Sequence, residues 1–183
     1  MTDGPSIDEI LMQRVSNDDA DSMDELVNRY ASRLMTIIRR MIGDHHRSEE
    51  IFQDVVLAIW KNREKYDFPR PVRPWVFKIA VNRCREALRK KDDSMTNKDL
   101  IVGSALSRNL LQTGASADES NQLVKDAVSS LPEQQRAVVV LRIWNGMSYL
   151  EIAEVVGVGE STVRSYMHHA LKSLRARLAP HGL

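Results

Sequence analysis

The chain has 183 residues, of which 43% are hydrophobic and 5% aromatic, with 26 basic and 25 acidic side chains. This length suits one ordinary domain or two small ones and excludes a large barrel enzyme. The longest apolar run, residues 55–60, is far shorter than the roughly 20 residues of a membrane helix, and the N-terminus lacks a signal-peptide pattern, so we expect a cytoplasmic protein without membrane insertion.

The charges are distributed unevenly along the chain. Residues 1–20 have one basic and five acidic side chains, and residues 21–91 have sixteen basic and ten acidic ones. Residues 92–124 have two basic and five acidic side chains, and residues 125–183 have seven and five. Two basic blocks separated by an acidic stretch indicate two modules that face a polyanion and a linker that does not.

Hydrophobic periodicity predicts helices throughout the first basic block. Apolar residues recur at helical spacing over residues 23–41, and Ser48 is the expected N-cap of a second helix that extends to Trp60. Three prolines predict a loop over residues 66–74, and a third helix is expected to begin near Trp75.

Basic and polar side chains recur on one face of this third helix, at spacings of four, three and four residues, and the loop before it mixes basic and aromatic residues. Basic groups hold a nucleic-acid backbone, and aromatic rings or pockets hold unstacked bases. The alternative, with equal weight, is that the aromatic residues pack the loop and the core. The candidate residues of this half are Arg63, Tyr66, Arg70, Arg73, Trp75, Lys78, Asn82, Arg85 and Arg89.

Residues 92–124 are polar and acidic with scattered apolar residues, which predicts a flexible linker with at most a short helical patch. After it, Ser130 and Glu133 have the spacing of a capping box that opens a helix reaching Gly146. No alternating strand pattern is visible along the chain, so the expected fold class is all-α.

A helix-turn-helix unit is predicted near the C-terminus. Ser148 and Glu151 form a second capping box before a short helix, Gly157 turns the chain, and residues 160–178 form a final helix with a polar face. In such a unit the second helix enters the major groove of DNA. The alternative is a polar face that binds a protein partner. The candidate DNA-binding residues are Ser161, Thr162, Arg164, Ser165, His168, His169 and Lys172.

Nothing in the sequence indicates an enzyme, a cofactor or a metal site. The histidine pairs at 45–46 and 168–169 lack acidic or cysteine partners at ligand spacing, and the single cysteine, Cys84, excludes a cysteine cluster and an internal disulfide. A glycine-rich phosphate loop and a nucleophile with an adjacent base are also missing, so we expect no catalytic residues.

Both basic blocks resemble the extracytoplasmic-function (ECF) group of bacterial RNA polymerase sigma factors. The segments EEIFQDVVLAIW and RPWVFKIAVNRCREALRKK are similar to the family's second region, and LPEQQRAVVVLRIWNGMSYLEIAEVVGVGESTVRSYMHHALKSLRARL is similar to its fourth region. The resemblance implies two small helical domains joined by a flexible acidic linker. The implied division is an acidic N-terminal segment at 1–20, region 2 at 21–91, the linker at 92–124, region 4 at 125–178 and a tail at 179–183.

The resemblance also implies a function. An alternative sigma factor binds core RNA polymerase, directs it to specific promoters and promotes DNA opening, without catalysing a reaction itself. Glu50, Gln53 and Asp54 stand where the family meets the polymerase. The loop and third-helix candidates stand where the −10 element is read and one unpaired base is captured, and the final helix stands where the −35 element is read. Because members of this family commonly have an anti-sigma factor as a partner, the resemblance also implies one.

Two other functions remain open from the sequence. A free-standing helix-turn-helix regulator would bind its operator without polymerase and use its N-terminal helices to dimerise or to sense a signal. An adaptor with basic faces would bind acidic proteins and be indifferent to promoter sequence.

Overall fold

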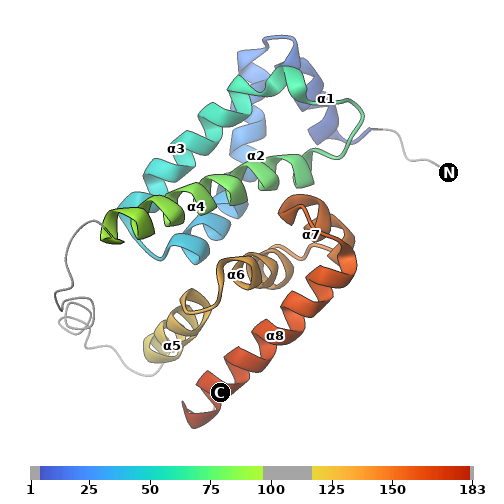
Figure 1. Ribbon diagram of the computed structural model, residues 1–183. Helices are drawn as coiled ribbons and strands as arrows, with labels where there is room; N and C mark the ends of the chain where they lie inside the picture. The colour runs from blue at the N-terminus through green and yellow to red at the C-terminus, as the bar shows by residue number, and fades with distance from the viewer. Residues whose placement is uncertain (1–4, 97–116, 182–183) are drawn as a thin grey trace.

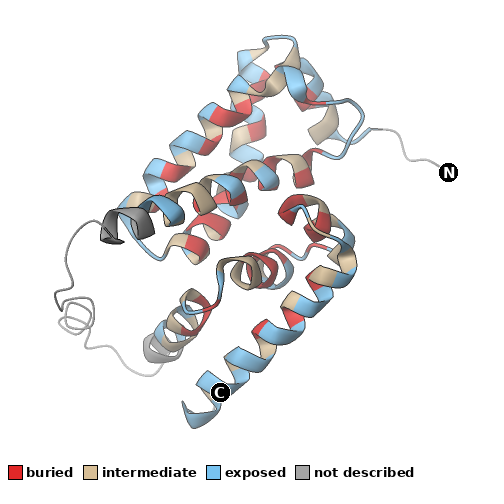
Figure 2. Cartoon of the chain, viewed as in Figure 1, coloured by how far each residue is buried: buried red, intermediate tan, exposed pale blue. Residues whose placement is uncertain are grey.

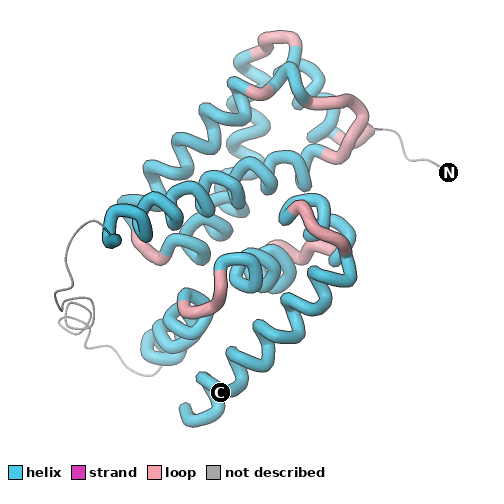
Figure 3. The backbone as a smooth tube through the Cα atoms, viewed as in Figure 1, coloured by secondary structure: helices cyan, strands magenta, loops and turns pink. Residues whose placement is uncertain are grey.

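The computed structural model describes residues 5–96 and 117–181 of the chain, and every regular element in these ranges is helical (Figure 3). The all-α prediction is confirmed. None of the described helices is both long and apolar enough to cross a membrane.

The first unit consists of four helices around a shared apolar centre (Figure 1). They are α1 (Ile7–Ser16), α2 (Ala20–Ile42), α3 (His45–Lys61) and α4 (Val72–Thr96), with a short 3₁₀ turn, η1 (Arg63–Lys65), after α3. The helix α1 lies in the acidic segment for which the sequence predicted no structure. A capping box starts it, because the Ser6 amide donates to the Glu9 carboxylate at 2.8 Å.

Two helix starts in this unit differ from the predictions. The N-cap of α3 is Asp44, whose carboxylate accepts from the Arg47 amide at 2.8 Å, whereas the predicted cap, Ser48, is buried and donates its hydroxyl to the Asp44 carbonyl. The helix α4 begins at Val72 and includes Pro74, so the loop is shorter than predicted. Proline is tolerated there because the first-turn amides of a helix have no intrahelical partner.

The second unit contains α5 (Ala117–Ser129), α6 (Glu133–Val139), α7 (Tyr149–Val156) and α8 (Glu160–Leu178), with short turns η2 (Val140–Trp144) and η3 (Ala179–His181). Helix therefore covers both ends of the range 92–124 that was predicted as linker, and residues 97–116 lie outside the described part.

The helix-turn-helix prediction is confirmed in its details. The Ser148 and Glu151 capping box opens α7, and Gly157 ends it with a left-handed φ of 79°.

The predicted box of Ser130 and Glu133 is wrong, because the Ser130 hydroxyl donates to the Ala127 carbonyl instead. The helix expected to run to Gly146 also changes at Val140 into a π-helical turn.

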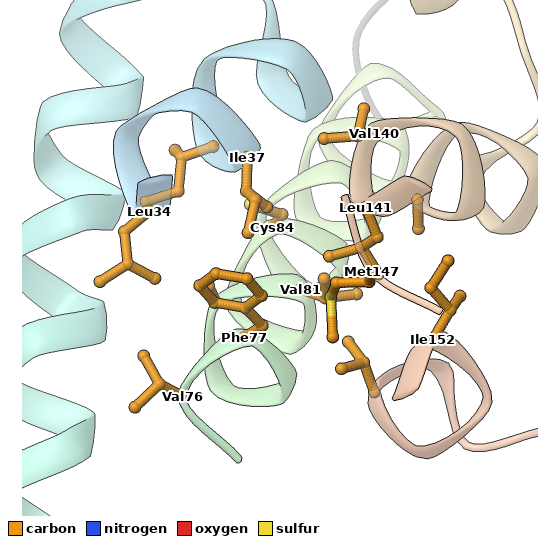
Figure 4. Close-up of a cluster of buried hydrophobic side chains, with 14 of the residues drawn as sticks. Leu34, Ile37, Val76, Phe77, Val81, Cys84, Val140, Leu141, Met147 and Ile152 are labelled. Atoms are coloured by element: carbon orange, nitrogen blue, oxygen red, sulfur yellow. The ribbon is translucent and has the colours of Figure 1, made fainter. Parts of the chain in front are cut away.

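The two units pack against each other through one continuous hydrophobic core (Figure 4). The helix α4 contacts α7, and α2 contacts α5, α6 and η2. Phe77 and Val81 of α4 lie between Leu34 and Ile37 of α2 on one side and apolar side chains of the second unit on the other. Those side chains are Val140, Leu141, Met147 and Ile152, all essentially inaccessible to solvent.

Candidate nucleic-acid interface

The predicted recognition helix, α8, exposes residues along its length (Figure 2), and most of the exposed side chains are polar. It packs on α5, α6 and α7, and it buries Val163, Met167 and Ala170 on its inner side. Arg164, Ser165, His168, His169, Lys172 and Ser161 are exposed, and Thr162 is half-buried. The structure therefore brings all the predicted −35 residues onto one accessible face, as a helix in the major groove requires.

Arg164 is held in place by two neighbours. Its guanidinium carbon lies 4.7 Å from the centre of the Tyr149 ring, and the same guanidinium pairs with the Glu160 carboxylate one turn earlier. A second arginine, Arg142, lies 5.0 Å from the centre of the same ring. Such contacts restrain a long side chain. Sequence reasoning missed Tyr149 and Arg142, because neither lies at a helical spacing from Arg164.

A surface pocket of about 290 Å³ lies between α3 and α4. It brings together Trp75, Lys78 and Asn82 of α4, which were predicted from the sequence, and adds Asn62 and Lys65 from the end of α3 and the turn after it. The Lys65 ammonium donates to the Asn62 side-chain oxygen at 3.0 Å, and the Asn62 amide donates to the Ala58 carbonyl at 2.7 Å. Asn62 was missed because one polar residue at a helix end carries no periodic signal.

The loop residue Tyr66 lies inside the fold, with 7% of its surface exposed. Its ring meets Trp75 edge to face at 5.7 Å between centres, and its hydroxyl donates to the Arg70 carbonyl. Burial raises the pKa of Tyr66 to about 12, so the hydroxyl stays protonated as a donor. In this arrangement Tyr66 supports the loop and the indole of Trp75.

Three predicted −10 residues, Arg70, Arg73 and Arg85, contact the second unit. Arg70 donates Nε to the Glu154 carboxylate at 2.9 Å, and Arg85 Nε lies 2.9 Å from the Glu133 carboxylate.

Arg73 donates to the Asn145 carbonyl and lies 3.8 Å from the Glu151 carboxylate. On the same basic face of α4, Lys78 and Arg89 are exposed.

The predicted polymerase-binding residues, Glu50, Gln53 and Asp54, are all exposed on the outer face of α3. Leu57 follows them at helical spacing and exposes 53% of its surface. Among the residues that the structure describes, no three histidine, cysteine, aspartate or glutamate side chains gather as metal ligands would.

Comparison with known proteins assigns the two units to the two sigma-factor regions that the sequence resembles. Residues 26–93 match the family profile "Sigma-70 region 2", and residues 121–174 match "Sigma-70, region 4". The ECF RNA polymerase sigma factor SigL of Mycobacterium tuberculosis (strain ATCC 25618 / H37Rv) is 30% identical over 174 residues, which cover 88% of this chain and 91% of SigL.

Two solved structures share the fold. The structure of CnrH in complex with the cytosolic domain of CnrY matches 96% of this chain and 99% of the compared chain, with a TM-score of 0.75 and 24% identity. The sigma factor RpoE in complex with the anti-sigma factor NepR from Bartonella quintana matches 85% of this chain and 96% of the compared chain, with a TM-score of 0.71 and 20% identity. With a region 2 and a region 4 in the order of the family, and a relative at this identity over most of its length, the chain belongs to the ECF RNA polymerase sigma factors, which direct transcription initiation and are not enzymes.

Proposed function

We propose that this sigma factor has three functional surfaces, of which two recognise the promoter and one binds core RNA polymerase. The exposed face of α8 reads the −35 element as duplex DNA, with Arg164 at a base edge. The pocket between α3 and α4 holds an unpaired base of the −10 element. The outer face of α3, with Gln53, Asp54 and Leu57, binds core RNA polymerase.

The pocket is the observation that carries this proposal. It has room for one nucleobase, an indole ring for stacking, two asparagine amides for hydrogen bonds to base edges, and two lysines for the backbone. Extruding a base costs a few kcal/mol, which a fitted pocket offsets. A duplex-binding face alone would not need such a pocket.

The division into domains follows the same logic. The proposed division has region 2 at 21–91 and region 4 at 125–178, with short segments at 1–20, which contains α1, and at 179–183. The linker at 92–124 includes the last residues of α4 and the first residues of α5. An anti-sigma factor is a further partner, supported by the likeness to RpoE in its complex with NepR. Core polymerase and the chromosome share the bacterial cytoplasm, so we place the protein there.

Two rival functions fit the chain less well. A free-standing regulator needs a duplex-binding helix but no pocket for an unpaired base. An adaptor for acidic proteins needs neither an ordered arginine at the start of α8 nor a region 2. A sigma factor needs all of these features together.

The test begins with core polymerase. The full-length protein is passed with bacterial core polymerase over a sizing column, and the complex is then supplied with a pool of genomic fragments and nucleotides. Stable one-to-one co-elution and discrete start sites with permanganate-reactive thymines upstream are the expected results. Binding to specific fragments without polymerase, and no start sites with it, would instead support the free-standing regulator.

A further inference from the structure

The helix α1 (Ile7–Ser16) and the turn after it contact both ends of the segment 62–72, which joins α3 to α4 and forms one side of the pocket. It lies before the residues that match the region 2 profile, which begin at position 26. In Figure 1 the dark-blue helix lies beside this segment, at the end of the first unit opposite the C-terminus of α4.

At the far end of the segment, Glu9 of α1 caps α4. Its Oε1 accepts from the amide of Val72, the first residue of α4, at 3.1 Å, and its Oε2 accepts from the Ser6 amide at 2.8 Å. The first amides of a helix have no intrahelical partner and carry a partial positive charge, so a carboxylate there is stabilising. Although burial acts to raise it, the pKa of Glu9 is held below its usual range by the hydrogen bonds from Ser6 and Val72.

At the near end, Asp18 holds Arg63. The Arg63 Nε donates to the Asp18 carboxylate at 2.7 Å, and Nη2 lies 2.5 Å from the same oxygen. Arg63 also donates Nη1 to the Trp60 carbonyl at 2.9 Å and lies over the Trp60 ring, 4.5 Å from its centre. The guanidinium therefore ties the turn after α1 to the C-terminal end of α3.

The helix itself is fixed to the core. Leu11, Met12 and Val15 are buried, and Asp8 accepts from the Tyr30 hydroxyl at 2.7 Å and from Arg29 Nε at 2.6 Å. Because α1 is anchored in this way, Glu9 has a fixed position from which it holds the first residue of α4.

We propose that Glu9 and Asp18 are positioning residues for the −10 element: they hold the two ends of segment 62–72 so that Asn62, Lys65 and Trp75 present one fixed pocket to the unpaired base. This inference rests on the proposed function of the pocket. It gives the acidic N-terminal segment a role in base selection rather than in polymerase binding.

The test compares Glu9→Gln, Asp18→Asn and the double variant with Asp8→Asn. Glutamine retains the shape of Glu9, and asparagine tolerates the φ of 68° at position 18. Asp8 is the matched control, because its carboxylate lies on the same helix but holds α2 instead of the segment. Each holoenzyme selects promoters from a pool with a randomised −10 element and a constant −35 element.

We expect enrichment of the preferred −10 sequence to fall by roughly three- to tenfold in the double variant, which the loss of one or two hydrogen bonds would produce. Affinity for core polymerase and for a −35 duplex should stay unchanged. Asp8→Asn should lower the melting temperature while keeping the −10 preference.

Two results would overturn the inference. One is a wild-type −10 preference in the double variant, and the other is an equal change of preference in Asp8→Asn. If the wild-type holoenzyme selects no −10 sequence at all, the proposed function fails and this inference falls with it. Amide exchange at Val72 provides a second readout. Glu9→Gln removes the charge and leaves one acceptor oxygen for the amides of Ser6 and Val72, so exchange should accelerate in the free protein.

Discussion

Arg136 of α6 donates Nη1 to the carbonyl of Met41 at 2.6 Å, which joins region 4 to the C-terminal end of α2 in region 2. The same guanidinium donates Nη2 to the Leu131 carbonyl at 3.1 Å. Burial lowers the pKa of Arg136, which has carbonyls rather than a carboxylate as its hydrogen-bond partners in the described structure. A half-buried cation at two helix C-termini is stabilised by the helix dipoles.

We therefore predict that Arg136→Met lowers the free energy of unfolding by about 1–3 kcal/mol, because several carbonyls lose their donor. Urea unfolding followed by circular dichroism measures this change. Arg175→Met, at an exposed position of α8, should change stability by less than about 0.5 kcal/mol. A loss of the same size in both variants would contradict the role of Arg136.

The ordered guanidinium of Arg164 predicts base-specific binding. Arg164→Ala should cost about 1–3 kcal/mol on the preferred −35 sequence and relax the preference at one position. Fluorescence anisotropy with selected and scrambled duplexes measures both effects. Arg175→Ala should weaken the two duplexes equally, and an equal loss for Arg164→Ala on both duplexes would exclude base readout by this residue.

Lys78 and Asn82 of the pocket are predicted to act on melted DNA. Their alanine variants should reduce opening of a duplex promoter by roughly five- to tenfold, the effect of about 1 kcal/mol in pocket contacts. Binding to a pre-melted promoter should fall less, because its bases are already unpaired. Permanganate reactivity and filter binding give the two values, with Lys61→Ala as the exposed control. Equal defects on both templates would count against a role in opening.

Gln53 and Asp54 are predicted to contact core polymerase. Alanine at both positions should weaken holoenzyme formation by about 1–2 kcal/mol, as contact residues in protein interfaces do. Competition against labelled wild-type protein measures the affinity, and circular dichroism shows that the fold is retained. Glu25→Ala, on an exposed face of α2, is the control and should bind normally. Unchanged affinity of the double variant would remove α3 from the interface.

The buried thiol of Cys84 predicts how the stability of the fold depends on pH. Burial raises the pKa of this thiol to about 12, above its ordinary value of 9.0, so the folded protein keeps the proton that the unfolded chain loses. Stability from this group is full below pH 9.0 and is lost as the pH rises toward about 12.

The largest slope from this single group is about 1.4 kcal/mol per pH unit. Urea unfolding at increasing pH should show that the wild type loses this contribution while Cys84→Ala does not, so the difference between them isolates the thiol from other titrating groups. Parallel curves for the two proteins would contradict the prediction.

Local sequence signals were sufficient for most helices and for the recognition face. Helical periodicity predicted α2, α3 and α8, because the side chains that pack inward must recur every three or four residues. The capping box at Ser148 and the left-handed Gly157 are similarly local, since each involves hydrogen bonds or backbone angles within one helical turn. The exposed residues of α8 follow from the same periodicity.

Contacts between distant parts of the chain carry no local signal. Glu9 caps Val72 and Asp18 pairs with Arg63 only because the tertiary fold places α1 beside the loop. Asn62 enters the pocket in the same way. The π-helical turn at Val140 also follows no spacing rule that periodicity could reveal.

The sequence by itself determined the all-helical class, the family resemblance and the face of α8, because these depend on residue spacing along single helices. Only the tertiary structure decided that Arg70, Arg73 and Arg85 meet carboxylates of region 4 and that the two regions share one core. Charge counts indicate that basic residues seek negative partners, but they do not say which ones. The partner is chosen by the apolar surfaces of α4 and α7, whose burial brings the charged side chains into contact.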